Sequence, residues 1–136
     1  MGTVVKIRDK ALESRYAIEL LSNKWRVTIL HILREGPLRT SAIQSAITEV
    51  SPKVLTQTLR GMERDGLIHR NVYTVVPPRV EYSLTPMAES LIKPLQDLCH
   101  WAKAHAQDRD SARARFDAES GLPAESVAFG AKRKSK

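Results

Sequence analysis

The stretch VSPKVLTQTLRGMERDGLIHR, residues 50–70, contains a helix whose start and end are both marked. Ser51 is a preferred N-cap residue, because its side-chain oxygen can accept a hydrogen bond from a backbone N–H of the first turn. Pro52 suits the first helical position, where its fixed φ is helical and its missing N–H is not needed. Gly66 supplies the left-handed residue that commonly follows a helix. The sequence therefore predicts a helix over residues 51–65.

The predicted helix has two chemically different sides. At about 100° per residue, Leu55, Leu59 and Met62 share one side. The opposite side gathers side chains that carry charge or hydrogen-bonding groups: Lys53, Thr56, Gln57, Arg60 and Arg64. In a DNA major groove Arg or Lys can bind guanine, Gln can bind adenine and the Thr methyl can contact thymine. This side is suited to reading bases, although a solvated surface helix has the same pattern.

Two shorter helical patterns precede this stretch. The first holds Trp25, Ile29, Ile32 and Leu33 at helical spacing and stops at Gly36-Pro37. Ser41 is placed to cap the second, which contains Ile43 and Ile47. Residues 1–14 are mixed and charged, so we expect a frayed lead-in to a helix that starts near Tyr16.

Two alternating patterns and a long apolar stripe follow the quoted stretch. Residues 68–73 and 80–84 alternate with period two and predict antiparallel strands. Their connection TVVPPR is too long for a tight turn and should project as a loop with Arg79 at its shoulder. Thr85-Pro86 repeats the cap-plus-proline signal and starts a last helix with a broad apolar stripe. From residue 107 to 136 the apolar spacing fades, and we expect a mostly disordered basic tail.

Positive charge is concentrated in the middle of the chain. The 136 residues carry a net charge of +7, and residues 24–79 hold nine Lys or Arg against four acids. Residues 86–106 hold two bases and two acids. The balance favours a polyanionic partner, either nucleic acid or an anionic membrane surface. Because the excess coincides with the helix pair and the strands, double-stranded DNA is the partner we expect, and not a membrane.

The element order predicts the fold class. Helix, turn, helix and then a two-stranded hairpin is the order of a winged helix-turn-helix, in which the second helix of the pair enters the major groove. We predict a mainly α fold with a small β-hairpin: a three-helix core, a wing and a long C-terminal helix. Phosphate contacts are expected from helix N-termini and flanking bases: Arg39, Ser41, Ser51 and, in the wing, Arg79.

Other chemistry has little support in the sequence. The four histidines form no i, i+4 pair, one cysteine cannot build a thiolate site, and we expect no metal. The glycines form no phosphate-binding loop and no nucleophile motif is present, so we expect no cofactor, no catalytic residue and no enzyme. The single Cys99 suits a reducing compartment, and with no signal-peptide core at the N-terminus we expect a cytoplasmic protein.

Several motifs resemble those of the HxlR-type winged-helix regulators, which are relatives of the MarR group. The most specific are SPKVLTQ at residues 51–57 and PPRVEYSLT at residues 77–85, joined by NKW (23–25), GPLR (36–39), DGLI (65–68) and LCHW (98–101). The resemblance covers residues 15–106. It implies a homodimeric bacterial transcription factor whose subunits join through their terminal helices, with the dimerisation helix at residues 86–106.

The resemblance also implies roles for individual residues. By position, Lys53, Thr56, Gln57 and Arg60 match the recognition-helix face and Arg79 matches a basic wing residue. The expected dimer interface draws on the first and last helices: Tyr16, Leu20, Met87, Leu91, Leu95, Leu98, Cys99, Trp101 and Ala102.

The chain departs from the family pattern at three places. Many members carry a reactive cysteine near the position of Ala11 or Leu12, and this chain has none there. Thr40 stands where an aromatic residue is usual, and Gly61 lies inside the predicted recognition helix, where glycine costs about 1 kcal/mol relative to alanine. Cys99 has two interpretations: a small buried hydrophobe, or a redox-sensitive or intersubunit thiol at the dimer seam.

The sequence thus predicts a sequence-specific DNA-binding transcriptional regulator that acts as a homodimer on an inverted-repeat operator. A small-molecule or redox effector is compatible with this prediction and stays unidentified. Two alternatives remain: an architectural DNA-binding protein of weak specificity, which the basic charge also permits, and a winged-helix module for protein interaction.

Overall fold

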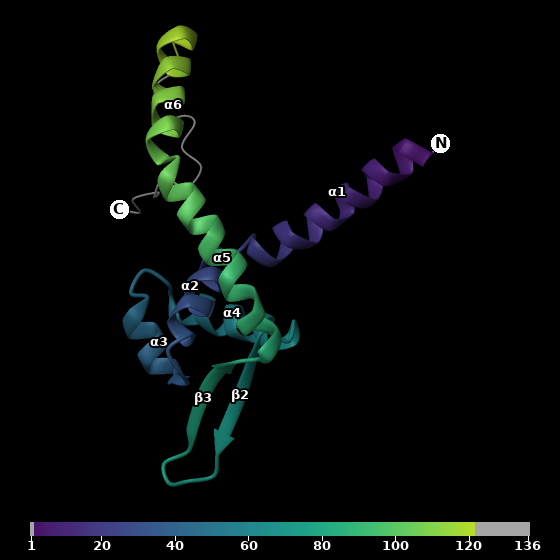
Figure 1. Cartoon of the computed structure of the whole chain (residues 1–136). Helices are drawn as coiled ribbons and strands as arrows, with labels where there is room; N and C mark the ends of the chain where they lie inside the picture. The colour runs from purple at the N-terminus through teal and green to yellow at the C-terminus, as the bar shows by residue number, and fades with distance from the viewer. Residues whose placement is uncertain (1, 122–136) are drawn as a thin grey trace. The chain divides into compact units, whose positions relative to one another are not determined.

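The computed structural model describes residues 2–121 and confirms the predicted fold class: mostly helical, with a small antiparallel sheet (Figure 1). The order is α1 (Gly2–Leu21), α2 (Lys24–Leu33), β1 (Leu38–Arg39), α3 (Thr40–Ala46), α4 (Pro52–Arg64), β2 (Ile68–Tyr73), β3 (Arg79–Leu84), α5 (Pro86–Ala104) and α6 (Ala106–Ser120). The chain divides into two compact units, Met1–Leu95 and Gln96–Lys136. The first unit holds the helix-turn-helix and the wing.

Helix α4 begins and ends as its sequence predicts. The Ser51 hydroxyl accepts a hydrogen bond from the backbone N–H of Val54 at 3.2 Å, and Pro52 occupies the first turn. At the other end Gly66 has φ +73°, while the N–H groups of Gly66 and Leu67 donate to the carbonyls of Glu63 and Met62. This pair of bonds is a Schellman motif, which satisfies carbonyls that the end of the helix would leave bare.

The sheet contains one strand more than the sequence predicts. Its order is β1-β3-β2, with both pairs antiparallel. Strand β1 has two residues, too few for an alternating pattern to be recognised. Because β1 leads directly into α3, Arg39 takes the N-cap position without a side-chain cap bond. The expected Ser41 cap is therefore wrong: α3 starts at Thr40, and Ser41 already lies inside the helix.

The core of the first unit brings α2, α3, α4, β2 and the first half of α5 together. Its buried apolar side chains are Ile29, Leu30, Leu33, Ile43, Ile47, Val50, Leu55, Leu59, Met62, Leu67, Ile68, Ala88, Ile92 and Leu95. Thr85 joins the wing to α5: its hydroxyl donates to the Gly66 carbonyl at 2.6 Å and accepts from the N–H of Ala88 at 3.2 Å. These bonds join Gly66 just after α4, the end of the sheet and the start of α5 within the first unit.

Both terminal segments differ from the sequence prediction. Residues 1–14 were expected to be a frayed lead-in, but α1 is helical from Gly2. Residues 106–120 form α6, so the disorder predicted from residue 107 onward is wrong for residues 107–120. Neither segment contains an internal proline or glycine, and α6 is rich in Ala and Arg, which have high helix propensity. The predicted tail beyond residue 121 lies outside the described residues.

Candidate nucleic-acid interface

The outward face of α4 carries the side chains that the sequence predicts for base reading. Lys53, Thr56, Gln57 and Arg60 are all exposed, whereas Leu55 and Leu59 on the opposite side are buried. The Thr56 hydroxyl donates to the Pro52 carbonyl at 2.9 Å, which leaves its methyl group and oxygen lone pairs available. Within residues 2–121, the side chains of Lys53, Gln57 and Arg60 form no hydrogen bond or ion pair.

Polar contacts to α2 and to its N-cap residue fix α4 at its middle and at its end. At the middle, the Thr58 hydroxyl accepts from the side-chain amide of Asn23, the N-cap of α2, at 3.4 Å and donates to the Val54 carbonyl at 2.8 Å. At the end, Arg26 donates to the Asp65 carboxylate at 2.6 Å. The turn between α3 and α4 is braced by Gln44, whose amide donates to the Val50 carbonyl at 2.7 Å. These contacts hold the exposed face of α4 in a defined orientation.

The predicted phosphate contacts at the helix starts lie on three different elements. Arg39 is exposed at the end of β1, opposite Glu81 in the sheet register. Ser41 is exposed in the first turn of α3. The Ser51 hydroxyl already accepts the Val54 N–H as the α4 cap, so a phosphate there would meet the hydroxyl proton and backbone N–H groups of the helix N-terminus.

Arg79, the predicted wing residue, is braced at the shoulder of the loop. Its guanidinium carbon lies 4.7 Å from the ring centroid of Tyr73, which is also its partner in the sheet register. Its Nε lies 3.4 Å from a Glu81 carboxylate oxygen, close enough for an ion pair but without the geometry of a hydrogen bond. The side chain as a whole is 38% exposed, although its Nε is buried.

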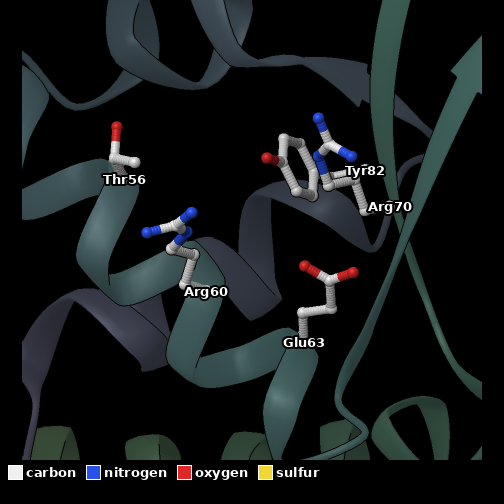
Figure 2. A pocket seen from close by; sticks show the side chains of 5 residues that line it. All are labelled: Thr56, Arg60, Glu63, Arg70 and Tyr82. Carbon is white, nitrogen blue, oxygen red and sulfur yellow. The ribbon is translucent and has the colours of Figure 1, made fainter.

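A groove of about 500 Å³ separates α4 from the wing, and the sequence did not predict it (Figure 2). Thr56, Arg60 and Glu63 line it from α4, Arg70 from β2 and Tyr82 from β3. Arg70 and Tyr82 are partners in the sheet register. The sequence does contain a signal for Arg70. It lies two residues after the buried Ile68 in β2, so its side chain is on the same face of the strand as a core residue, where a basic residue is unusual.

The residues predicted for a dimer interface divide into two groups. Tyr16, Met87, Leu98 and Trp101 are large and exposed, and Cys99 and Ala102 are exposed too. Leu20 and Leu91 are half-buried and pack against the core. Leu95 is 3% exposed and belongs to the buried core cluster of the first unit, so within a single chain its side chain is already covered. The interpretation of Cys99 as buried does not hold within a single chain.

Neither metal binding nor membrane insertion gains support from the part of the chain that the structure describes. Among residues 2–121, no three His, Cys, Asp or Glu side chains gather in a way that could hold a metal ion. None of the described helices combines the length and apolar character that crossing a membrane requires.

A helix-turn-helix with an exposed polar second helix, followed by a hairpin wing, defines a winged-helix DNA-binding fold. The family profile described as HxlR-like helix-turn-helix matches residues 20–110. The HTH-type transcriptional regulator YkvN of Bacillus subtilis (strain 168) is 44% identical over 89 residues, covering 65% of this chain and 75% of YkvN. The chain belongs to the HxlR-like helix-turn-helix family and is a transcriptional regulator.

Solved structures agree with this assignment. A transcriptional regulator of the MarR family from Enterococcus faecalis V583 has a TM-score of 0.67 at 36% identity, covering 75% of this chain and 93% of that chain. The redox regulator HypR in its reduced form has a TM-score of 0.68 at 27% identity, covering 73% of this chain and 98% of that chain. These relatives are regulators and not enzymes, as the sequence predicted.

Proposed function

We propose that this regulator binds DNA sequence-specifically as a homodimer and that its operator is an inverted repeat. The observation that carries the proposal is the exposed face of α4. Lys53 and Gln57 lie in its first two turns and have no side-chain partner within residues 2–121, while the opposite side of the helix is buried in the core. In helix-turn-helix proteins, the N-terminal residues of the second helix contact base edges.

The contacts divide into those that specify and those that position. Lys53, Thr56 and Gln57 would contact bases, whereas Arg39, Ser41, Ser51 and Arg79 would contact the phosphate backbone. Loss of a base contact costs about 1–3 kcal/mol and relaxes the preference for one base pair. Loss of a phosphate contact weakens binding to every duplex and lowers its salt dependence.

The dimer part of the proposal is supported by large apolar side chains left exposed on α1 and α5. Tyr16 is 72% exposed and Trp101 61%, and Met87 and Leu98 are about half exposed. Exposed apolar surface of this kind marks protein interaction sites. A two-fold dimer would bring two copies of α4 to half-sites about 34 Å apart, one turn of the double helix.

Sedimentation equilibrium of the full chain and of a Leu98→Asp variant tests the dimer. The wild type should sediment as a dimer at micromolar concentration, and the variant should shift toward monomer while its far-UV circular dichroism stays unchanged. A wild type that stays monomeric both alone and on operator duplex would refute the dimer.

Competition binding tests the specificity. An operator can be selected from a pool of randomised duplexes and compared with a random duplex of equal length at one salt concentration. The expected specificity ratio is about 10³ or more. A ratio near one would instead support an architectural DNA-binding protein, a function that the basic groove and wing also favour. Absence of duplex binding even at low salt would favour a protein-interaction module.

The proposed regulator would respond to a redox or small-molecule signal. HypR is described as a redox regulator. In this chain an oxidant would have to act on Cys99, its single cysteine, which is exposed on α5. Footprinting with and without oxidants, repeated on Cys99→Ser, tests this route: oxidation should change the wild-type footprint alone. An unchanged footprint would point to a small-molecule effector.

A further inference from the structure

The groove between α4 and the wing contains two arginines that come from different elements. Arg60 projects from α4 and Arg70 from β2, and Figure 2 places both guanidinium groups along the same opening. Tyr82 lies between them in that view, with its hydroxyl directed toward α4. With Thr56 and Glu63 also in its lining, the groove presents two guanidinium groups, two hydroxyls and one carboxylate to whatever occupies it.

Within residues 2–121, neither arginine forms an ion pair. This is unlike Arg26, Arg79 and Arg109, whose guanidinium nitrogens lie 2.6, 3.4 and 3.5 Å from carboxylates of the same chain. A carboxylate is nearby, because Glu63 lines the same groove, yet no ion pair joins it to either arginine. The two guanidinium groups thus keep their donors for an anion from outside the chain.

The position of Arg60 along α4 indicates which anion. It lies eight residues beyond Pro52, which is about 12 Å along the axis at 1.5 Å per residue. The major groove is about 12 Å wide. When the first turns of a helix enter the groove, a residue about 12 Å further along the helix therefore lies near the sugar-phosphate backbone. Base edges are contacted by residues nearer the helix start.

We propose that Arg60 and Arg70, helped by the Tyr82 hydroxyl, bind one and the same backbone phosphate in each half-site. This inference rests on the proposed function and changes the role of Arg60 from a base contact to a phosphate contact. Arginine suits the task, because its planar guanidinium can donate two parallel hydrogen bonds to one phosphate. Glu63 places a negative charge beside this phosphate site, so it weakens binding to every duplex.

The salt dependence of binding tests the shared phosphate. Binding of the full chain to operator and random duplexes is measured by fluorescence anisotropy over a range of salt for Arg60→Ala, Arg70→Ala and the double variant. Each single change should lower the slope of log K against log salt by about one on both duplexes. The double variant should also lower the slope by about one and not by two, because each single variant and the double variant lose the contact with the same phosphate.

Arg64→Ala is the matched control, because Arg64 is exposed on α4 one turn beyond Arg60 but does not line the groove. Its effect on affinity should add to that of Arg70→Ala, whereas the effects of Arg60→Ala and Arg70→Ala should not add. Glu63→Gln should tighten binding to both duplexes several-fold. Unchanged thermal unfolding of each variant would show that the altered binding does not come from a damaged fold.

A second measurement locates the phosphate. Neutral methylphosphonates are introduced one at a time along the operator, and one position in each half-site should weaken the wild type but neither single variant. Slopes that fall by two in the double variant, or different sensitive positions for the two arginines, would overturn the shared site. If the wild type bound operator and random duplex equally well, the proposed sequence-specific function would be refuted. The shared phosphate site could still be tested, because the salt slopes of the variants can be measured on random duplex. Wild type that binds no duplex would overturn both.

Discussion

Replacing Gly61 by alanine should leave the stability of this protein nearly unchanged, although the same change usually stabilises a helix. Alanine in a helix interior is favoured over glycine by about 1 kcal/mol. In this chain a Cβ atom at residue 61 would lie 2.8 Å from Nη2 of Arg26, too close for the guanidinium to stay in place. Arg26 would have to move, and its ion pair with Asp65 would be weakened or lost.

The ion pair is worth enough to offset the gain in helix propensity. Its nitrogen and oxygen are 2.6 Å apart, with side chains 17% and 43% exposed. A pair of this intermediate burial contributes about 1 kcal/mol, above most surface pairs and far below a buried one. Asp65 also follows the last turn of α4, where the helix dipole disfavours a negative charge unless a cation is near. The two effects should cancel to within about 0.5 kcal/mol.

A double-mutant cycle separates the two effects. Gly61→Ala is measured by urea unfolding in the wild type and in an Arg26→Ala background, where no guanidinium occupies the space. The substitution should stabilise the Arg26→Ala protein by about 1 kcal/mol and the wild type by about zero. An equal gain in the two backgrounds would refute the account, since it would mean that Arg26 does not pack across Gly61.

Three further changes have definite expected outcomes. Arg79→Ala should weaken binding to operator and random duplexes alike and lower the salt slope by about one, and an unchanged slope would remove the wing from the interface. Thr85→Ala should lower the free energy of unfolding in urea by about 1–3 kcal/mol, because it leaves the Ala88 N–H and the Gly66 carbonyl without their side-chain partner. A loss below about 0.5 kcal/mol would contradict this. Ser51→Ala should cost about 1 kcal/mol as a lost N-cap, whereas Ser51→Gly should cost only a few tenths.

The sequence predicted those parts of the fold that local signals define. Ser51, Pro52 and Gly66 gave the limits of α4 because cap chemistry is decided within four or five residues. Period-two alternation gave β2 and β3 for the same reason. Strand β1 was missed, because two residues carry no period and their pairing with β3 joins positions more than forty residues apart. Helix α6 was missed because it buries no residue and so has no apolar stripe to recognise.

The sequence predicted the part of the candidate site that lies on one helix, and it missed the part that is formed by two elements together. The exposed face of α4 follows from helical geometry, and the structure leaves Lys53 and Gln57 exposed. The groove shared by Arg60 and Arg70 depends on how the wing packs beside α4, which no local pattern specifies. The consequence of a glycine at residue 61 also depends on tertiary structure, because a Cβ atom there would meet the Arg26 side chain of α2.

The most direct test of the central claim is the base preference of a Gln57→Ala variant, selected from the same randomised duplex pool as the wild type. If α4 lies in the major groove with Gln57 against a base edge, the variant should lose its preference at one base pair in each half-site and keep the rest of the selected sequence. An identical selected sequence for wild type and variant would contradict base reading by this residue. Loss of preference at every position at once would contradict its assignment to a single base pair.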